Sequence, residues 1–572
     1  DYVVKPFELE ILEHLDNEAG NFGKYTAANG GSADKIALGI EPATAYVQGY
    51  RNEKVGTTFI DIDKPRVGST GAIEQSNTQI NIGNYLKLDP ATVFGIPDII
   101  NFTTINLTEA DGTVIGTARV RGMETFTNPV ETRLYIFDIT MNSTKSITAD
   151  VLKVAGSNSF AGTLTVTTPK LVVGNNTSVF KLPADAIRDL GTSSGNPGEL
   201  ANATSYYIKR SASFTPTGGA LTINTGGAGN FQDLNDVQIW QTGSAIKTGV
   251  DGYRTSGGNG TNSVTYNSSS IGLTDDVVCT VLFTVVKTVA RKGKTIAHNP
   301  VTKAYTITAL GQSGDGNTAS WSLGATDIIK IRSVTCASTG STDYKDIFTL
   351  DNGQRENFYD NGKIIKQAGT SPLPAGVMTI TFENYEHDAG GDYFSVDSYP
   401  GTDYGIIPSF SSVNGNIQLR DCIDFRSSKD AAGTGIVAAT ATGAAKVGHS
   451  FVSNINYYLP RIDKLAIKRD GSFEIISGVA SEYPQPPANL DDGLTLYQLR
   501  LKPYVFTLAD VTPVMQDNKR YTMKDISRLD KRIKNLEYYT SLSLLEQSAA
   551  DIHMVDANGN PRLKNGILVD SF

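Results

Sequence analysis

The sequence contains few cysteines and no closely spaced pair of them. Three occur in 572 residues, at Cys279, Cys336 and Cys422. An odd number of widely separated cysteines argues against a disulfide framework, and the lack of a C-x-x-C pair argues against a cysteine-ligated zinc site. Because free cysteine behaves as a small apolar residue, we expect all three side chains to lie in a buried core.

Long apolar runs and an excess of positive charge are also missing. The longest mainly apolar run, VVCTVLFTVV at 277–286, is well short of the about 20 residues that a transmembrane helix needs. Its β-branched residues favour a buried strand instead. The chain has 50 Lys and Arg against 59 Asp and Glu, a formal net charge of -9, which disfavours a role in coating nucleic acid. We therefore expect neither a membrane span nor a nucleic-acid partner.

Two short motifs suggest enzymes but lack the context that the chemistry needs. GTSSG at 191–195 matches the nucleophile pattern G-x-S-x-G with Ser193 at its centre, yet its flanks do not read as a strand entering a helix. GKT at 293–295 resembles the end of a phosphate-binding loop, but Thr288 occupies the position of the first glycine. We predict a polar loop at Ser193 and no phosphate cradle at Lys294.

One segment, EHDAGGDYFSVDSYPGTDYG at 386–405, concentrates acidic residues. The candidates are Glu386, His387, Asp388, Asp392, Asp397 and Asp403. Paired carboxylates can act on a glycan as acid and base, or with His387 can hold a divalent cation. Because the spacing matches no calcium loop, turn-forming acids between strands are the default interpretation. The five histidines are far apart in the sequence, and we predict no catalytic, metal-binding or cofactor-binding residue.

What the sequence does contain is turn-forming residues and short alternating strands. Its 56 glycines and 39% hydrophobic content are typical of a folded, mainly β protein. We predict several sandwich-like or barrel-like β domains, one of them an inserted immunoglobulin-like domain, and an amphipathic helix near the C-terminus. The predicted domains are a β-rich domain at 1–142, the insertion at 143–330, a second β-rich domain at 331–500, and a helical segment with a hairpin return at 501–572.

Two Asp-Gly pairs are strong turn signals. Asp111-Gly112 predicts a turn between strand-like runs, and Asp470-Gly471, between LAIK and SFEII, predicts a hairpin. A further hairpin is predicted from RLKNGILV at 562–569. The chain opens on Asp1 without an initiator methionine and stops just inside that last strand, so we expect a piece of a longer polypeptide.

A charged amphipathic helix is predicted from Thr522 to about residue 550, because Thr522 and Asp525 match a capping box. Two apolar stripes follow at helical spacing, the first containing Ile526, Leu529, Ile533 and Leu536 and the second Tyr538, Leu542 and Leu545. The first stripe spans only two heptads, too few for a sustained coiled coil. We predict that both stripes are buried, against this chain or a neighbouring subunit. Mixed charges, with Asp530 and Lys534 paired at i,i+4, disfavour binding to nucleic acid or a membrane.

Nine short segments carry a resemblance to a known family. They are AYVQGYR (45–51), TTFIDIDKPR (57–66), GNYLKLD (83–89), ETRLYIFDI (131–139), DNGQRENFYDNG (351–362), GDYFSVDSYP (391–400), IQLRDCIDFRS (417–427), RYTMKDISRLDKRIKNLEYYTSLSLLEQ (520–547) and GNPRLKNGILVDSF (559–572). In this order they resemble large virion structural proteins of tailed bacteriophages, and those of contractile-tailed phages that infect cyanobacteria look closest. The resemblance covers 1–142 and 341–572. It departs at Ser427, where proline is usual, and across 143–330.

The resemblance implies a non-catalytic structural component of the virion tail, at the baseplate or where tail fibres attach. It implies assembly with other tail or baseplate proteins and with copies of this chain, a trimer being favoured by analogy with the family, and it implies no cofactor. Two alternatives stay open. One is a receptor-binding module that recognises a host surface polysaccharide through the middle domain, and the other is a glycan depolymerase that uses the carboxylates of 386–403.

Overall fold

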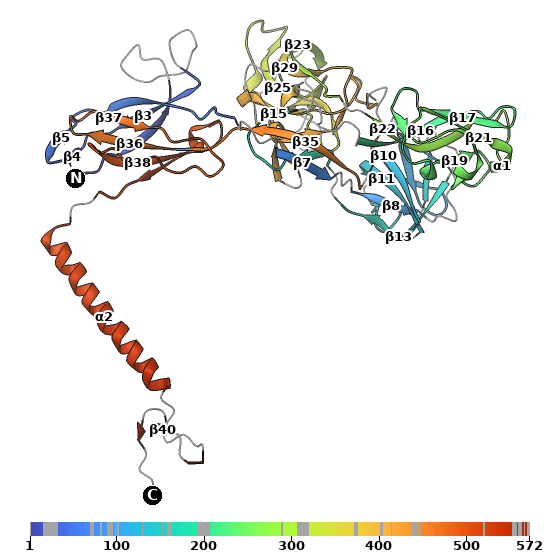
Figure 1. The fold of residues 1–572 in the computed structure, drawn as a ribbon. Helices are drawn as coiled ribbons and strands as arrows, with labels where there is room; N and C mark the ends of the chain where they lie inside the picture. The colour runs from blue at the N-terminus through green and yellow to red at the C-terminus, as the bar shows by residue number, and fades with distance from the viewer. Residues whose placement is uncertain are drawn as a thin grey trace. The chain divides into compact units, whose positions relative to one another are not determined.

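Antiparallel strands are the main secondary structure of the described chain, which confirms the predicted mainly β class, and the long helix α2 (Met523–Asp551) follows near the C-terminus (Figure 1). The coordinates are those of a computed structural model. It describes residues 2–568 except for 15–31, 69–73, 80–82, 89–94, 98, 100–101, 128–129, 143, 152, 157–162, 175–176, 192–205, 288–289, 306–319, 371–375, 401–403, 413–414, 438–443, 447, 519–520, 552–556, 559–562 and 565–566.

Unit 1 combines the two ends of the chain, Asp1–Arg66 and Pro460–Phe572. The described residues of unit 1 form four antiparallel sheets. In strand order these are β1 (Tyr2–Lys5), β4 (Thr44–Val47) and β5 (Tyr50–Glu53); β2 (Leu9–Glu13), β3 (Lys35–Ile40) and β6 (Thr58–Asp63); β37 (Phe473–Ile476), β36 (Arg461–Lys468), β38 (Gly493–Leu501) and β39 (Val511–Met515); and the pair β40 (Leu563–Lys564) and β41 (Ile567–Leu568). A 3-10 turn, η11 (Leu508–Asp510), precedes β39.

The core of unit 1 is shared by its two segments. Phe7 and Leu38 from the first segment lie in one buried apolar cluster with Leu465 and Leu499 from the second. The Tyr497 hydroxyl also donates to the main-chain oxygen of Phe7 at 2.7 Å. The two segments therefore form one folding unit although most of the chain separates them in sequence.

Unit 2 is continuous in sequence, Val67–Leu459. Six of its strands form a closed barrel in the order β10 (Val114–Thr127), β11 (Val130–Met141), β8 (Tyr85–Leu88), β13 (Thr163–Val172), β12 (Lys153–Gly156) and β9 (Thr104–Thr108). The next sheets along the chain are β15 (Ile187–Gly191), β35 (Ser450–Tyr457) and β7 (Glu74–Gln79); β18 (Asn230–Phe231), β22 (Cys279–Lys287), β16 (Tyr206–Phe214) and β34 (Ala444–Ala445), with β19 (Gln238–Gln241) also on β22; and β17 (Ala220–Asn224), β21 (Ser263–Asn267) and β20 (Arg254–Gly257).

The part of unit 2 that matters most for the site contains two three-stranded sheets and several strand pairs. The sheets are β23 (Lys294–Tyr305), β29 (Gly376–His387) and β25 (Ile328–Cys336), and β24 (Ser320–Thr326), β28 (Asn361–Lys366) and β26 (Phe348–Asp351). The pairs are β14 (Val179–Lys181) with β32 (Cys422–Asp424), β27 (Phe358–Tyr359) with β33 (Ser427–Ser428), and β30 (Ser409–Ser412) with β31 (Gly415–Gln418). The short helices are α1 (Ser268–Ile271), η4 (Leu234–Asp236), η5 (Val250–Tyr253), η7 (Lys345–Ile347), η8 (Val396–Ser398), η9 (Tyr404–Ile406) and η10 (Leu419–Asp421).

The two ends of unit 2 lie side by side. The Leu459 N–H donates to the main-chain oxygen of Val67 at 2.9 Å, and Gly68 forms an antiparallel bridge with Tyr458. Beyond them, β7 pairs with β35. The chain thus leaves unit 1 and returns to it at one place, the arrangement in which a whole domain can be inserted without disturbing its host.

The strand pairing does not follow the domain boundaries predicted from composition. The barrel continues past residue 142, because β12 and β13 complete it against β9 and β8. Within 143–330, strands β14, β15 and β23 pair with β32, β35 and β29, which lie outside that range. Composition does not register such long-range pairing. The inserted segment that the structure delimits is 67–459.

The predictions that depended on local sequence are confirmed. Gly112 and Gly471 adopt the positive φ values of 91° and 81° at the turns that join β9 to β10 and β36 to β37. Most of the run at 277–286 forms β22, a largely buried strand, and β40 and β41 pair as the last hairpin. All three cysteines are buried, as expected.

Candidate functional site

Helix α2 begins with the capping box that the sequence predicted. The Thr522 hydroxyl donates to Oδ2 of Asp525 at 2.6 Å, and the Asp525 N–H donates to Oγ1 of Thr522 at 3.3 Å. Further along, Lys534 Nζ lies 2.9 Å from Oδ2 of Asp530, the expected i,i+4 pair. These local contacts explain why the helix forms at this point in the sequence.

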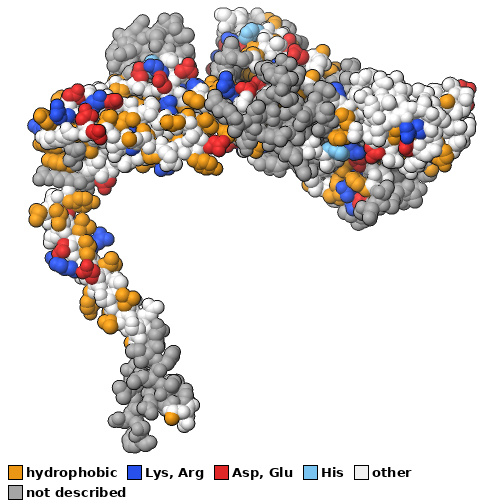
Figure 2. Space-filling model, viewed as in Figure 1, with side chains coloured by type: hydrophobic (Ala, Val, Ile, Leu, Met, Phe, Trp, Pro, Cys, Tyr) orange, Lys and Arg blue, Asp and Glu red, His pale blue; other side chains and the backbone are white. Residues whose placement is uncertain are grey.

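Both apolar stripes of α2 are exposed on the single chain. Their members are Ile526, Leu529, Ile533, Leu536, Tyr538, Leu542 and Leu545. The exposed fraction of these side chains ranges from 38% at Leu542 to 68% at Leu536. Figure 2 shows hydrophobic side chains along the helix, with charged side chains among them. The residues that the structure describes leave both stripes open to solvent, so their burial, against this chain or a neighbouring subunit, stays a prediction.

The residues that were weighed for catalysis take separate structural roles. Ser193 and Asp403 lie outside the described residues. Asp392 is buried in an ion pair with Lys287. Asp397 accepts a hydrogen bond from a main-chain N–H of β15 at 2.9 Å. Both of these described carboxylates thus bind other parts of the chain.

The structure brings Lys294 and His387 together with residues that the sequence analysis did not single out. Lys294 opens β23, and its Nζ lies 2.7 Å from Oδ2 of Asp327, which sits in the turn between β24 and β25. His387 closes β29 and places Nε2 3.1 Å from the same oxygen and Nδ1 2.6 Å from Oγ of Ser428. Gln354 Nε2 donates to the other oxygen, Oδ1, at 2.7 Å. Three side chains therefore converge on the Asp327 carboxylate.

Aromatic rings surround the Lys294 ammonium. The ring centres of Phe394, Tyr399 and Tyr359 lie 4.4, 4.5 and 4.6 Å from Nζ, and the two tyrosine hydroxyls accept hydrogen bonds from it at 3.1 and 3.0 Å. Burial lowers the pKa of Lys294, although the nearby Asp327 carboxylate favours the charged form. Burial also acts to raise the pKa of Asp327, but the Lys294 ammonium and the His387 hydrogen bond outweigh it and hold that pKa well below its usual range.

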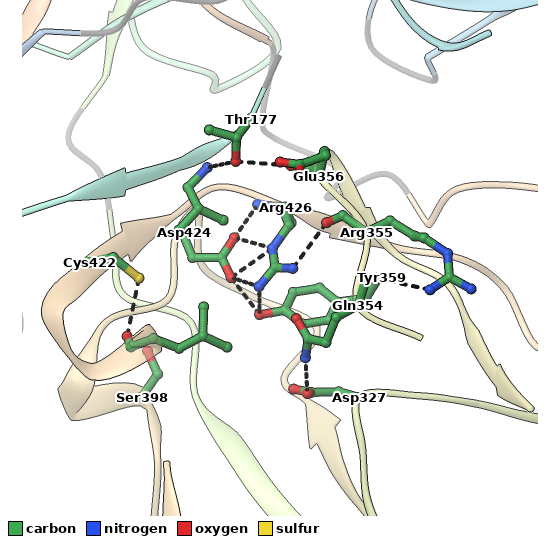
Figure 3. A network of polar contacts seen from close by, with 12 residues as sticks. Thr177, Asp327, Gln354, Arg355, Glu356, Tyr359, Ser398, Cys422, Asp424 and Arg426 are labelled. Atoms are coloured by element: carbon green, nitrogen blue, oxygen red, sulfur yellow. Dashed lines mark hydrogen bonds and ion pairs between the residues drawn. The ribbon is translucent and has the colours of Figure 1, made fainter. Parts of the chain in front are cut away.

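A second buried ion pair adjoins the first through Tyr359, whose hydroxyl accepts from Lys294. Figure 3 shows this second pair, Arg426 with Asp424, beside Tyr359. The Arg426 guanidinium donates to Asp424 with Nη2 at 2.7 Å from Oδ2 and Nε at 3.0 Å from Oδ1. Nη2 also donates to the Tyr359 hydroxyl at 3.1 Å, and that hydroxyl donates to Asp424. Burial acts to lower the pKa of Arg426, but the Asp424 carboxylate outweighs burial and raises it. Charges buried this completely are held only where partners satisfy them.

A cavity of about 760 Å³ opens beside His387, with Asn299, Asn384, Glu386 and Asp388 among the residues that line it. Asn299 Nδ2 donates to Oδ1 of Asn384 at 2.9 Å and to Oε1 of Glu386 at 3.2 Å. The volume lies within the range of about 300–1,000 Å³ that is typical of ligand pockets. Across the described part of the chain, no three His, Cys, Asp or Glu side chains gather to hold a metal ion.

The sequence does not predict the roles of four of these residues, Asp327, Gln354, Asp424 and Arg426. Each of them, taken alone, is typical of a turn or of a solvated charge. One local signal existed at Asp424 and Arg426. Asp424 ends β32 and Arg426 follows two residues later, within the quoted segment IQLRDCIDFRS, and i,i+2 spacing in an extended chain places two side chains on one face. The contacts to Asp327, by contrast, join segments that only the fold brings together.

The C-terminal part of the chain matches a family described as a domain of unknown function (DUF4815), over residues 428–572. This range contains β36 to β39 of unit 1 and all of α2. Comparison with curated proteins and with solved structures gave no match. None of the described helices combines the length and the apolarity that crossing a membrane requires.

Proposed function

We propose that this chain is a non-catalytic structural protein of a phage tail, at the baseplate or at the attachment of tail fibres, and that it assembles through α2. The observation that carries the proposal is the exposure of both apolar stripes along the helix. Exposed apolar side chains gathered along one element in this way mark a protein–protein contact. An isolated helix in water is also only marginally stable, so packing by a partner would support it.

The partner that α2 fits best is a second and a third copy of itself. The first stripe, Ile526 to Leu536, offers a seam for one neighbour, and the rotated second stripe, Tyr538 to Leu545, offers a surface for another. A helix with two apolar faces requires two neighbours, which closed cyclic symmetry supplies in a trimer. Arg532 and Glu537 flank the first seam five residues apart, the spacing at which a parallel bundle pairs opposite charges on adjacent helices.

The placement in a virion rests on the nine sequence segments that resemble phage structural proteins. Two of these segments, 520–547 and 559–572, lie within the range that matches the family of unknown function. Helix α2 therefore belongs to the part of the chain that this family model covers. That family's description assigns no role. Labelling phage particles with antibodies to unit 1 would test the placement, and absence of the chain from purified particles by mass spectrometry would contradict it.

Sedimentation of the full chain tests assembly through α2. The wild-type protein is expected to sediment as a trimer. The double variant Ile533→Asp with Leu536→Asp is expected to sediment as a monomer whose β units keep their thermal transitions, because both side chains are exposed in the single chain.

The matched control is the double variant Lys531→Ala with Arg532→Ala, which changes the charged face of the same helix and leaves the apolar stripes intact. Loss of one exposed charge pair at each interface should weaken the trimer only slightly. A monomeric wild-type chain would contradict the proposal. So would a charge variant that dissociates while the Asp variant still assembles.

Recognition of a host polysaccharide is a second candidate function, and the cavity beside His387 is the observation that favours it. Its amide and carboxylate side chains provide both donors and acceptors for sugar hydroxyls. A glycan array probed with the full chain tests this candidate. Binding that disappears in Glu386→Gln and persists in Asn235→Ala, an exposed amide that does not line the cavity, would support it. An array without any binding would contradict it.

A further inference from the structure

The Lys294–Asp327 pair is placed for a reaction between its two members. The exposed fractions of the two side chains are 0% and 2%, and 2.7 Å separates Nζ from Oδ2. The residues come from different elements, β23 and the turn between β24 and β25. Asp327 holds a φ of 55°, a left-handed conformation that aspartate tolerates better than most residues. Its carboxylate therefore lies where the lysine of another strand reaches it.

We propose that Lys294 and Asp327 become joined by an amide bond between Nζ and Cγ, an intramolecular cross-link within unit 2. The reaction begins when a proton passes from the ammonium to the carboxylate, which gives a neutral amine and a neutral acid. The amine nitrogen attacks Cγ, the bond from Cγ to Oδ2 breaks, and Oδ2 leaves as water with two of the three ammonium hydrogens. The amide keeps Oδ1 and one hydrogen on Nζ. Net charge is unchanged and no oxidant or co-reactant is needed.

The side chains that touch the Asp327 oxygens fit the needs of this reaction. Gln354 Nε2 donates to Oδ1, the oxygen that gains negative charge when the amine attacks. His387 Nε2 contacts Oδ2, the oxygen that must be protonated to leave. Burial lowers the pKa of His387, which favours the neutral ring, and an imidazole can accept a proton and return it. One donor thus supports the attack and one proton carrier supports the departure of water.

The surroundings also favour the product over the ion pair. In water, ammonium and carboxylate are strongly solvated, which opposes condensation. Within the aromatic cage that solvation is lost, and burying two charges carries a penalty that their mutual attraction does not always repay. A neutral amide removes both charges from the interior. Fixed proximity adds to this, since well-oriented neighbouring groups react with effective concentrations of about 10⁵–10⁸ M.

The cross-link would tie β23 to the connection between β24 and β25. It would thereby join the sheet of β23, β29 and β25 to the end of β24, which belongs to the other three-stranded sheet. Closing the loop from Lys294 to Asp327 restricts the unfolded chain, as a disulfide does, and so raises the free energy of unfolding. Unlike a disulfide, an amide resists reduction. Unit 2 would gain a permanent fastening that needs no cysteine.

The intact mass of the full chain, measured after denaturation, tests the proposal. The cross-linked protein is expected to weigh one water molecule less than its sequence predicts. Proteolytic digestion should then release a branched species in which the Lys294 peptide and the Asp327 peptide are joined. A wild-type chain of full calculated mass, with both peptides recovered separately, would overturn the proposal.

Three variants assign the lost water to this pair. Lys294→Arg and Asp327→Ala should each show the full mass of their own sequence. The matched control is Lys209→Arg, because Lys209 is another buried lysine, with Nζ 2.5 Å from Oδ2 of Asp236, and its loss should leave the cross-link in place. Loss of water that persists in Lys294→Arg would place the modification elsewhere and overturn the assignment.

His387 can be tested separately as the proton carrier. In freshly synthesised protein, His387→Gln is expected to slow the cross-linking reaction, so that the cross-linked fraction is lower at early times and then rises slowly. The reason is that glutamine keeps the hydrogen bond to Asp327 but cannot carry a proton. A cross-linking rate equal to that of the wild type would remove His387 from the mechanism.

Discussion

The two units differ in how much charge lies in their cores, although unit 1 also buries one carboxylate, Asp463, beside Arg461. The core of unit 1 is an apolar cluster, in which Leu465 and Leu499 pack against residues from the other end of the chain. Unit 2 has apolar clusters as well, but near β23 and β29 it buries two ion pairs, Lys294 with Asp327 and Arg426 with Asp424. Apolar packing tolerates substitutions of similar volume, whereas a buried charge tolerates no loss of its partner. The comparison therefore indicates that the core of unit 1 tolerates substitutions better than the core of unit 2.

The units also differ in how the chain builds them. Unit 1 needs both ends of the chain, whereas unit 2 is complete between Val67 and Leu459. The buried pairs of unit 2 are therefore assembled within one continuous segment. We therefore expect each unit to unfold independently of the other, in response to different changes in the chain. Three experiments test this expectation.

The largest effect is expected from deletions. Replacing 67–459 by a short flexible linker should leave unit 1 folded, because the chain leaves and rejoins unit 1 at one place. Deleting only 143–330 should unfold the remainder of unit 2, since β32, β35 and β29 would lose strands that they pair with. Circular dichroism and thermal unfolding distinguish the two outcomes. A well-folded remainder after deletion of 143–330 would restore the boundaries predicted from composition.

A smaller effect is expected from breaking one buried pair. Arg426→Met leaves the Asp424 charge without its main partner, which should lower the free energy of unfolding of unit 2 by roughly 3–5 kcal/mol. The double variant Arg426→Met with Asp424→Leu removes both charges and should recover part of that loss. Leu465→Ala, at a fully buried position of unit 1, should cost about 2–5 kcal/mol and act on unit 1 alone. Denaturant unfolding of the full chain measures the stability of all three variants. If Arg426→Met were as stable as the wild type, the expected sensitivity of the unit 2 core to substitution would be refuted.

The smallest effect concerns pH. Burial raises the pKa of Asp421 in unit 2 to about 6 from an ordinary value of 3.8, although a hydrogen bond from the Ile187 N–H opposes this. An acid with a raised pKa contributes its full stabilisation below its unfolded pKa and loses it as pH rises through the folded one. Unit 2 should therefore lose up to about 3 kcal/mol of this contribution between those two values. Asp421→Asn should flatten that slope in pH-dependent denaturation, and an unchanged slope would place the titration elsewhere.

The sequence predicted what depends on neighbours along the chain. Thr522 and Asp525 are three residues apart, so their capping contacts could be foreseen, and the same holds for the turns at Gly112 and Gly471. The spacing of the α2 stripes could also be predicted from the sequence. The partner that covers the stripes could not, because it is not encoded in the spacing of these residues.

The centre of unit 2 was not predictable in the same way. Lys294, Asp327 and His387 come from widely separated positions, and their meeting depends on the pairing of β23 with β29 along its full length. Lys294 was considered only as part of a phosphate loop, and His387 only within an acidic segment. Burial, which gives both residues their chemistry, is a property of the fold and has no signature at a single position.

The joined ends of unit 2 have a mechanical consequence. The Val3 N–H donates to the main-chain oxygen of Asn518 at 2.9 Å, so the first strand of unit 1 is bonded to the segment that leads into α2. Tension applied through the helix would reach β1 and β39 first. Because unit 2 is attached at Val67 and Leu459, which are themselves hydrogen-bonded, that tension has no route through its interior. Under a load applied through α2, unit 2 would therefore stay outside the path of the force.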